Sequence, residues 1–400
     1  GHQGNMVDGQ TPNLLIRQGT MQPIYDGENI STVANLPNPN LKWEQTAQTN
    51  IGWDLGFFDG RLNIGGDFYY KKTTDLFTNV DVSPINGITS YIMNNGDMLN
   101  KGFSISLNGY PVKTKNFRWY MSTYYSVNLN KVQTDDARNY NLNDYLNGTA
   151  VVSGQPISTF YSYKFLGLNP QNGAPMFDDW EDRWHLLQGK TLDEVVPMIL
   201  VNSGTRDPKF SGDLNNTFTY KNWSLSLNFS YSLGSKVRLF EMYGPIINGI
   251  SAAANVREEF LDRWQVPGDE KYTVYPSIIS PSSPDYEHYR LHYSAPQRAV
   301  GPNSGVPAFA NNVWQMYDDS DLRVVSGNYL KLQSLSFSYR LNDRLLRKTP
   351  FTQLSISFNT HNCFTISAKE LRGQDPSQAG FADAGLSIRP SYTIGLNVSF

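Results

Sequence analysis

Cysteine is almost absent from this chain: one residue in 400, Cys363, is a cysteine. A single cysteine excludes an internal disulfide framework and a zinc site built on cysteines. Charged residues are also sparse, at 17% against a typical ~25%, and they sum to a net charge of −3. No basic run of the kind that follows a nucleic-acid backbone is present, so the charges indicate neither a nucleic acid nor a polyphosphate as partner.

Long apolar runs are missing as well. The longest, Val195 to Val201, contains Pro197 and is far shorter than the ~18 residues of a transmembrane helix. Low hydropathy does not exclude a membrane β-barrel, because half of each barrel strand is polar. The first residues, Gly1 to Asn5, contain neither the basic region nor the apolar core of a signal peptide. We therefore expect a chain that begins inside a longer protein.

Aromatic residues are abundant, with 24 Tyr, 21 Phe and 8 Trp, which is typical of β proteins. The last ten residues show the pattern of a strand: Tyr392, Ile394, Leu396, Val398 and Phe400 alternate with polar residues and Gly395. Side chains of a strand point to opposite faces with period 2, so this strand has one apolar and one polar face. The pattern suits a barrel in lipid with its apolar side outward, and equally a strand of a soluble sandwich.

The same alternation recurs along the chain and predicts about eleven strands. They cover 43–57, 62–70, 103–109, 117–129, 161–165, a short return through 176, 214–220, 223–231, 335–341, 354–358 and 391–400. Two helical pieces are expected, one near Leu192 to Leu200 and one where Val256, Phe260 and Trp264 recur every four residues. Large aromatics at both ends of the first hairpin, Phe57 and Phe58 at its turn and Tyr69 and Tyr70 opposite, fit girdles at two membrane interfaces.

Short and long connections alternate between these strands. The short ones are 58–61, 111–116, 169–173, 221–222 and 342–350, and the long ones hold most of the remaining residues. A soluble sandwich has no reason to place every short turn at one end, whereas an outer-membrane barrel has short periplasmic turns and long outer loops. The spacing therefore favours an all-β transmembrane antiparallel barrel. An odd strand number indicates part of a barrel, since single-chain bacterial barrels normally have an even number.

Several motifs resemble the carboxy-terminal barrel of SusC/RagA-type TonB-dependent transporters, and they occur in family order over most of the chain. They are Asn38-Pro39-Asn40-Leu41-Lys42-Trp43-Glu44, Leu55-Gly56-Phe57-Phe58, Phe68-Tyr69-Tyr70-Lys71-Lys72, Asn100-Lys101-Gly102-Phe103, Gly167-Leu168-Asn169-Pro170, Asp207-Pro208-Lys209-Phe210-Ser211-Gly212, Asn215-Asn216-Thr217-Phe218-Thr219-Tyr220-Lys221, Leu261-Asp262-Arg263-Trp264, Asn328-Tyr329-Leu330-Lys331-Leu332 and Thr393 to Phe400.

The resemblance implies a 22-stranded plugged barrel in the outer membrane of Bacteroidota. It also implies a SusD-like surface lipoprotein as lid, and import of oligosaccharides or peptides driven by TonB. Residues 1–400 would be the carboxy-terminal portion of that barrel, with outer loops at 1–40 and near 131–160, 178–205, 236–326 and 362–390. The plug domain, the TonB-contacting segment and the first strands would be absent from this chain and supplied by the amino-terminal portion.

The resemblance also implies roles for single residues. Phe400 resembles the terminal aromatic that the barrel-assembly machinery recognises, together with Tyr392, Leu396 and Val398. Exposed aromatics of outer loops stack on sugar rings or anchor partner proteins, and they equally pack loops against one another. The candidates are Trp180, Trp184, Tyr286, Tyr289, Tyr293, Trp314 and Tyr317. Candidate lumen-lining groups are Asn63, Asp67, Asn108, Asn216, Asn228 and Gln333.

Motifs for catalysis are weak, and we predict no enzyme, no cofactor and no metal. Gln188-Gly189-Lys190-Thr191 lacks the earlier glycine of a phosphate-binding loop, since Trp184 stands there. His288 and His292 lack the glutamate of a zinc-protease helix. Asp318, Asp319 and Asp321 fit no standard calcium loop and are expected to form a solvated acidic loop. The alternatives to a transporter are an outer-membrane scaffold for surface lipoproteins and a secreted β-sheet carbohydrate-active protein.

Overall fold

A computed structural model describes residues 1–5, 15–21, 29–81, 85, 87–88, 90–134, 140–178, 183–187, 190, 192–244, 256–279, 282, 286, 299–300, 306–307, 312–347, 349–378 and 389–400. Its dominant element is one antiparallel sheet of ten strands within these residues. In spatial order they are β1 (His2–Asn5), β4 (Glu44–Phe57), β5 (Leu62–Thr74), β8 (Asp97–Lys113), β9 (Phe117–Gln133), β14 (Phe210–Tyr220), β15 (Trp223–Leu233), β20 (Tyr329–Arg340), β21 (Gln353–Ser367) and β22 (Ser391–Ser399). This sheet confirms the all-β antiparallel fold class. Closure into 22 strands stays a prediction.

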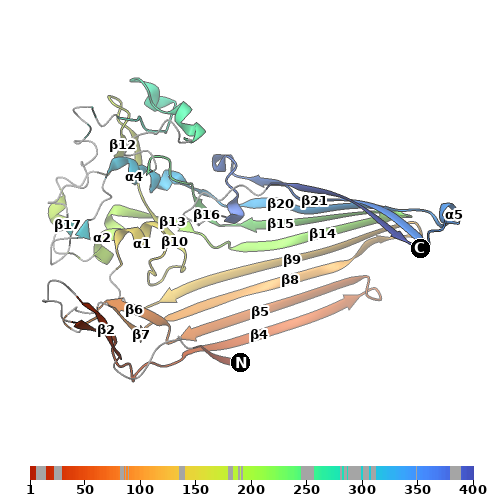
Figure 1. Ribbon diagram of the computed structural model, residues 1–400, viewed down its shortest axis with the longest axis horizontal. Helices are drawn as coiled ribbons and strands as arrows, with labels where there is room; N and C mark the ends of the chain where they lie inside the picture. The colour runs from red at the N-terminus through yellow and green to blue at the C-terminus, as the bar shows by residue number, and fades with distance from the viewer. Residues whose placement is uncertain are drawn as a thin grey trace.

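All the short connections of this sheet lie at one end, where the carboxy terminus and α5 (Asp343–Leu346) are drawn in Figure 1. The turn after β4 places Phe58, Asp59 and Gly60 at positive φ, and Lys221 takes the same conformation after β14. Left-handed residues give a two-residue hairpin the twist of its strands. The turns expected at 58–61 and 221–222 are therefore confirmed.

The opposite end of the sheet carries the long connections (Figure 1). In their described residues these connections form six two-stranded sheets: β2 (Leu15–Met21) with β3 (Asn29–Asn35), β6 (Phe77–Asp81) with β7 (Ser90–Asn94), β10 (Thr159–Tyr163) with β13 (Leu200–Thr205), β11 (Phe165–Leu168) with β12 (Pro175–Phe177), β16 (Lys236–Arg238) with β19 (Val324–Ser326), and β17 (Ala299–Val300) with β18 (Val306–Pro307). Helices here include α1 (Leu142–Leu146), α2 (Leu192–Ile199) and α4 (Val313–Asp318).

Two of the expected wall strands are wrong. Residues 161–165 and the return through Met176 form β10, β11 and β12, which belong to the loop sheets. All five residues of β10 are buried, whereas a wall strand shows one face to lipid. Its five residues are also too few to cross a bilayer, which takes about nine to eleven.

The two expected helices had different outcomes. The piece near Leu192 to Leu200 is confirmed as α2. The candidate around Val256 to Trp264 is only a short 3₁₀ segment, η5 (Glu258–Asp262). Phe260 of this segment and Trp264, two residues beyond it, are buried, while Val256 before it is 45% exposed. None of the helices in the described part of the chain has the length and apolarity needed to span a bilayer.

Candidate channel wall and outer loop cap

The polar face of the sheet is set by strand register. Asn63 lies opposite Asn108, Asn108 opposite Ser122, and the row continues through Asn215 and Asn228. A second row runs from Asp67 through serines at 104, 126, 211 and 232. Since directly opposed residues share a face, five strands present hydroxyl and amide groups to one side.

Hydrogen bonds between neighbouring strands fix these side chains. Asn63 Nδ2 donates to Asn108 Oδ1 at 3.3 Å, and Gln333 Nε2 donates to Ser230 Oγ at 2.7 Å. Tyr69 spans two strands: its hydroxyl donates to Asn128 Oδ1 at 2.8 Å. The ring of Tyr69 fills the space above Gly102, where a Cβ would also lie 2.0 Å from the carbonyl oxygen of Val127. Hydroxyl and amide groups make up most of this face, and Asp67 and Asp213 add carboxylates to it. Tyr69 is thus part of the polar face rather than of an aromatic girdle.

Asn216 is an exception, and its predicted place on the polar face is wrong. The register puts it between Met121 and Leu227, on the same face as Phe218. Its Oδ1 accepts a hydrogen bond of 2.9 Å from the indole Nε1 of Trp119. An apolar environment requires such a partner for a buried amide, so the Trp119 indole explains how an asparagine is tolerated there.

The apolar face is exposed in this chain, which is what a lipid-facing surface requires. Ile51 is 63% and Leu55 50% exposed. Aromatic residues gather near both ends of this face. At the turn end Trp119 stacks on Phe218 at 5.7 Å and Trp223 stacks on Phe337 at 5.2 Å; at the loop end Tyr125 contacts Phe103 and Phe210 at 5.9 and 6.0 Å. These two bands correspond to the girdles of membrane barrels.

The main hydrophobic core of the chain lies in the outer loops rather than in the sheet. Buried residues from 140–200, 242–260 and 313–317 form one cluster, which we call the loop cap. Its members include Tyr163, Leu187, Val195, Met316 and Tyr317, each 1% exposed or less. Loops that are far apart in sequence thus fold as one unit at the outer end of the sheet.

Asp318 joins two of these loops. Its carboxylate accepts hydrogen bonds from the backbone N–H groups of Met242, Tyr243 and Gly244 at 2.8, 2.8 and 2.9 Å. Burial raises the pKa of Asp318 to about 6, against the opposing effect of the Arg323 charge and of these three donors. The expectation of a solvated acidic loop is therefore wrong for Asp318, which is 3% exposed because the backbone donors replace water.

Two arginines complete the polar centre of the cap. Arg238 Nη2 donates to the carbonyl oxygens of Leu146 and Tyr161, and Arg323 Nη2 donates to that of Phe240. Arg238 Nη1 also lies 4.0 Å from Asp319, whose pKa is raised to about 7 by burial. Arginine suits this role because its fork of donors satisfies several carbonyls at once. Within the described residues no cluster of three or more metal-ligating side chains is present.

The predicted loop aromatics fall into three groups. Trp314 and Tyr317 are buried in the cap, at 4% and below 1% exposure, and Tyr286 stacks on Trp314 at 5.9 Å. Trp184 begins a short 3₁₀ segment, η3 (Trp184–Leu186). Trp180, Tyr289 and Tyr293 lie outside the described residues, as do His288 and His292. The packing of Tyr286, Trp314 and Tyr317 agrees with the packing alternative, and a role in substrate or partner contact stays a prediction.

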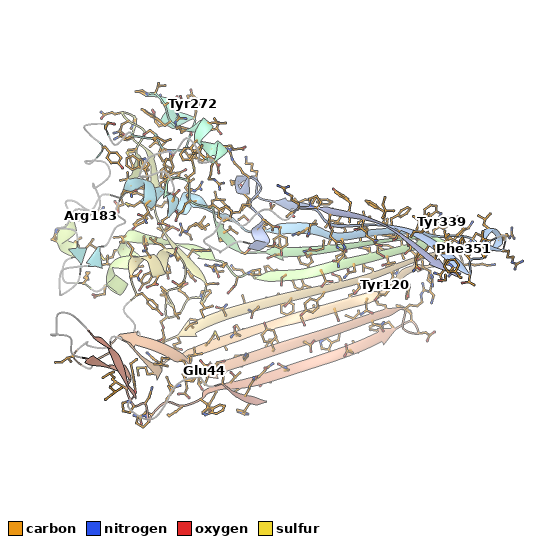
Figure 2. All side chains as sticks on the ribbon, viewed as in Figure 1. Glu44, Tyr120, Arg183, Tyr272, Tyr339 and Phe351 are labelled. Carbon is orange, nitrogen blue, oxygen red and sulfur yellow. The ribbon has the colours of Figure 1, made fainter. Side chains whose placement is uncertain are left out.

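Sequence reasoning missed an exposed apolar protrusion at 261–274, which we call the knob. Tyr272 is 91%, Leu261 77% and Val266 58% exposed, and Figure 2 shows Tyr272 projecting far from the sheet. Asp269 accepts the backbone N–H groups of Gln265 and Val266, which lowers the pKa of its carboxyl. In 261–274 single apolar residues stand among Asp, Glu and Gly, and this pattern could have predicted an exposed apolar surface.

The carboxy-terminal strand forms as expected. In β22 the apolar residues Tyr392, Ile394 and Leu396 are 65–79% exposed, and Phe400 is 84% exposed just beyond it. The ring of Phe400 contacts that of Phe351 at 5.3 Å. Recognition of Tyr392, Leu396, Val398 and Phe400 by assembly machinery stays a prediction.

A sheet with one aromatic-banded apolar face and one polar face, with short turns at one end and a folded cap at the other, defines the wall of an outer-membrane β-barrel. Comparison with known proteins agrees. A family model described as "TonB dependent receptor-like, beta-barrel" matches residues 11–257. The match covers more than half of the chain, so the chain belongs to this family.

Individual relatives are consistent with that assignment. TonB-dependent receptor P3 of Formosa agariphila is 25% identical over 93% of this chain and 36% of the relative. TonB-dependent receptor SusC of Bacteroides thetaiotaomicron is 30% identical over 53% of this chain and 21% of SusC. The structure described as the RagAB peptide transporter matches the whole chain and 40% of the neighbour, with a TM-score of 0.70 and 20% identity.

The resemblance inferred from the sequence motifs is thus confirmed, as is localisation in the outer membrane. The family is one of receptors and not of enzymes. The chain spans roughly one to two fifths of the length of the relatives compared here. For the activity, substrates and partners of the whole protein we therefore make proposals.

Proposed function

We propose that the complete receptor imports oligosaccharides or peptides across the outer membrane, using energy relayed by TonB, and that it has no catalytic activity. Residues 1–400 form its carboxy-terminal barrel portion, and the amino-terminal portion supplies the plug, the TonB-contacting segment and the other strands. The observation that carries this proposal is the polar face of β5, β8, β9, β14 and β15, a wall made mainly of hydroxyl and amide groups, with carboxylates at Asp67 and Asp213, beneath the loop cap.

The chemistry of this wall favours polar solutes that are not strongly charged. Asn108, Ser122 and Asn215 offer both donors and acceptors, which match sugar hydroxyls and peptide groups equally well. One charged pair close to this face, Lys331 with Asp375 at 3.2 Å, is 4% and 9% exposed and mutually neutralised. A wall of this kind permits repeated weak hydrogen bonds, so a solute can move along it. One structural neighbour is described as a peptide transporter. We therefore propose peptides as well as glycans as substrate classes.

The outer loops are proposed to carry the partner surface. The long excursions expected at 1–40 and near 131–160, 178–205, 236–326 and 362–390 include the wall strand β1 and the ends of β9 and β21. The other described residues of these excursions lie at the end of the sheet where a SusD-like lipoprotein would sit. Within them the knob presents Tyr272 and Leu261 on a support held by charge-assisted hydrogen bonds. Exposed, pre-organised aromatics are frequent anchors of protein interfaces. The predicted loop aromatics Trp180, Trp184, Tyr289 and Tyr293 are further candidates for substrate or partner contact.

Uptake by cells tests the proposal. A strain lacking the complete receptor, complemented with the wild-type gene, is supplied with fluorescent oligosaccharides or peptides of defined length. We expect complementation to restore energy-dependent uptake of one class, and dissipation of the proton gradient to abolish it. Unchanged uptake of both classes in the deletion strain, with loss of a surface lipoprotein, would instead support the scaffold.

A paired variant addresses the partner surface. Tyr272→Ser with Leu261→Ser removes the apolar groups of the knob, and Leu345→Ser in α5, 54% exposed at the turn end, is the control. We expect the knob variant to lose co-purification with a lipoprotein while α5 variants keep it. Equal retention by both would contradict the partner surface and leave import itself intact.

A further inference from the structure

A cleft opens on the apolar face of the sheet at its turn end. Its volume is about 510 Å³, within the range of about 300–1,000 Å³ of small-molecule sites. The residues that line it are mostly apolar: Phe58, Arg61, Leu62, Leu107, Gly109, Tyr110, Pro111 and Met121. They come from the β4–β5 turn and from β5, β8 and β9.

A break in strand pairing creates the cleft. The register between β8 and β9 shifts between Gly109 and Val112, and Tyr110 N instead donates to the carbonyl oxygen of Arg61 at 2.8 Å. A Cβ at position 109 would lie 2.3 Å from that oxygen, so only glycine allows the two backbones to come this close. Beyond the register shift the ring of Tyr110 contacts that of Tyr120 at 5.2 Å, and Tyr110, Pro111 and Met121 line the hollow.

The cleft opens toward lipid and not toward the polar wall. Leu62 pairs with Gly109, and Gly109 pairs with Met121, so these positions share one face. Phe57, which pairs with Leu62, is 42% exposed on the same face. In the membrane, hydrocarbon rather than water fills an apolar hollow on this side.

One cation stands at the cleft. Arg61 is the charged residue among those that line it, and it is exposed. In the described part of the chain, no carboxylate is within ion-pair distance of its guanidinium. The short turns mark the periplasmic side, so Arg61 lies at the level of the headgroups of the inner leaflet.

We propose that this cleft holds one anionic phospholipid of the periplasmic leaflet. Arg61 donates a bidentate pair of hydrogen bonds to the phosphate, a geometry that guanidinium groups favour. One acyl chain lies in the hollow between Leu62, Leu107 and Met121. The lipid completes the wall where β8 departs from regular pairing. This site is separate from the proposed import path, because it lies on the other face of the sheet.

Native mass spectrometry of the complete receptor, released from detergent in the presence of phosphatidylglycerol, tests the proposal. We expect the wild type to retain one tightly bound phosphatidylglycerol. Arg61→Gln should weaken its binding about tenfold, the effect of losing a charge-assisted hydrogen bond. Lys115→Gln, which removes an exposed cation of the neighbouring 114–116 turn outside the cleft, should change binding little. Diacylglycerol, which has no phosphate, should not be retained.

A second variant tests the hollow itself. Leu107→Trp fills it without changing any charge, and we expect loss of the retained phospholipid with heat-modifiable mobility of the barrel unchanged. Equal phosphatidylglycerol retention by wild type and Arg61→Gln would overturn the proposal. So would equal losses in Arg61→Gln and Lys115→Gln, because they would show diffuse surface charge instead of a site.

Discussion

The wall and the loop cap of this chain are stabilised by opposite means. The cap has a buried apolar core, and hydrogen bonds from Asp318, Arg238 and Arg323 hold its polar centre, although the Nε atoms of both arginines have no partner among the described residues. The wall has almost no buried core within the described residues. It relies on continuous strand pairing, with side chains on both faces partly exposed. The cap therefore follows the rules of a water-soluble protein, whereas the stability of the wall depends on the lipid that surrounds it.

The largest loss of stability is expected from Asp318→Ala, which removes interactions in the cap only. It leaves the buried N–H groups of Met242, Tyr243 and Gly244 without an acceptor. At about 1–2 kcal/mol for each unsatisfied donor, we expect a loss of about 3–6 kcal/mol. Hydrogen exchange should accelerate at 240–244 and in α4 and stay unchanged in β14 and β15. The control is Asp262→Ala, whose side chain is 61% exposed. Uniform acceleration across the wall would show that cap and wall unfold together.

The second-largest loss of stability is expected in the wall. Leu214→Lys places a charge on the apolar face midway between Phe210 and Phe218 of the two aromatic bands, and we expect it to cost about 2–4 kcal/mol in lipid. Its neighbour Asn215 points to the polar face, so Asn215→Lys should cost little. Urea titration of folding into lipid bilayers measures both. Equal costs would mean that the two faces are not distinguished by lipid and water.

This pair of neighbouring residues also shows how much of the fold can be predicted from the sequence. Period-2 alternation predicted nine of the long wall strands. Lipid on one side and a polar interior on the other require apolar and polar residues at alternate positions. It failed where that physics does not apply. β10 has both faces in the dry cap, so its alternating aromatics imitate a wall strand, and Asn216 depends on the Trp119 indole, contributed by another strand. Which loop residues pack and which project depends on contacts between segments some 75 residues apart, such as Asp318 and Tyr243, and no local pattern encodes them.

The cap should also respond to pH in a way that the wall does not. Burial raises the pKa of Asp319 to about 7, above the ~3.9 of an unfolded aspartate. The folded cap then binds the proton more tightly than the unfolded chain does, so its stability falls as pH rises from about 4 to about 7. We expect a change of about 2 kcal/mol, smaller than the full shift implies, because a fifth of the side chain stays exposed. Limited proteolysis of the loops at pH 5 and pH 7.5 measures it, and Asp319→Asn should reduce the response to the part that the raised pKa of Asp318 contributes. Faster cleavage at pH 5 would contradict the sign.

Two tyrosines of the cap allow a finer comparison. The Tyr243 hydroxyl donates to the carbonyl oxygen of Pro276, whereas the buried Tyr317 hydroxyl has no hydrogen-bond partner among the described residues. Tyr243→Phe should therefore cost about 1–2 kcal/mol and Tyr317→Phe nearly nothing. Thermal unfolding of the cap, followed by near-ultraviolet circular dichroism, separates the two. A larger loss for Tyr317→Phe would reveal a bond to a group outside the described residues.

The smallest effect on stability, and the most specific effect on the wall, is expected at the carboxy terminus. Phe400 and Phe351 contact each other through their rings, so Phe400→Ala and Phe351→Ala remove the same interaction, worth about 0.5–1.5 kcal/mol. The two differ in that only Phe400 ends the final strand. If the terminal aromatic is an assembly signal, Phe400→Ala lowers the amount of receptor inserted into the outer membrane, whereas Phe351→Ala does not. Quantitative immunoblotting of outer-membrane fractions makes the distinction. Equal reductions would assign the effect to ring packing, and the wall would then depend at this end on the same side-chain contacts as the cap.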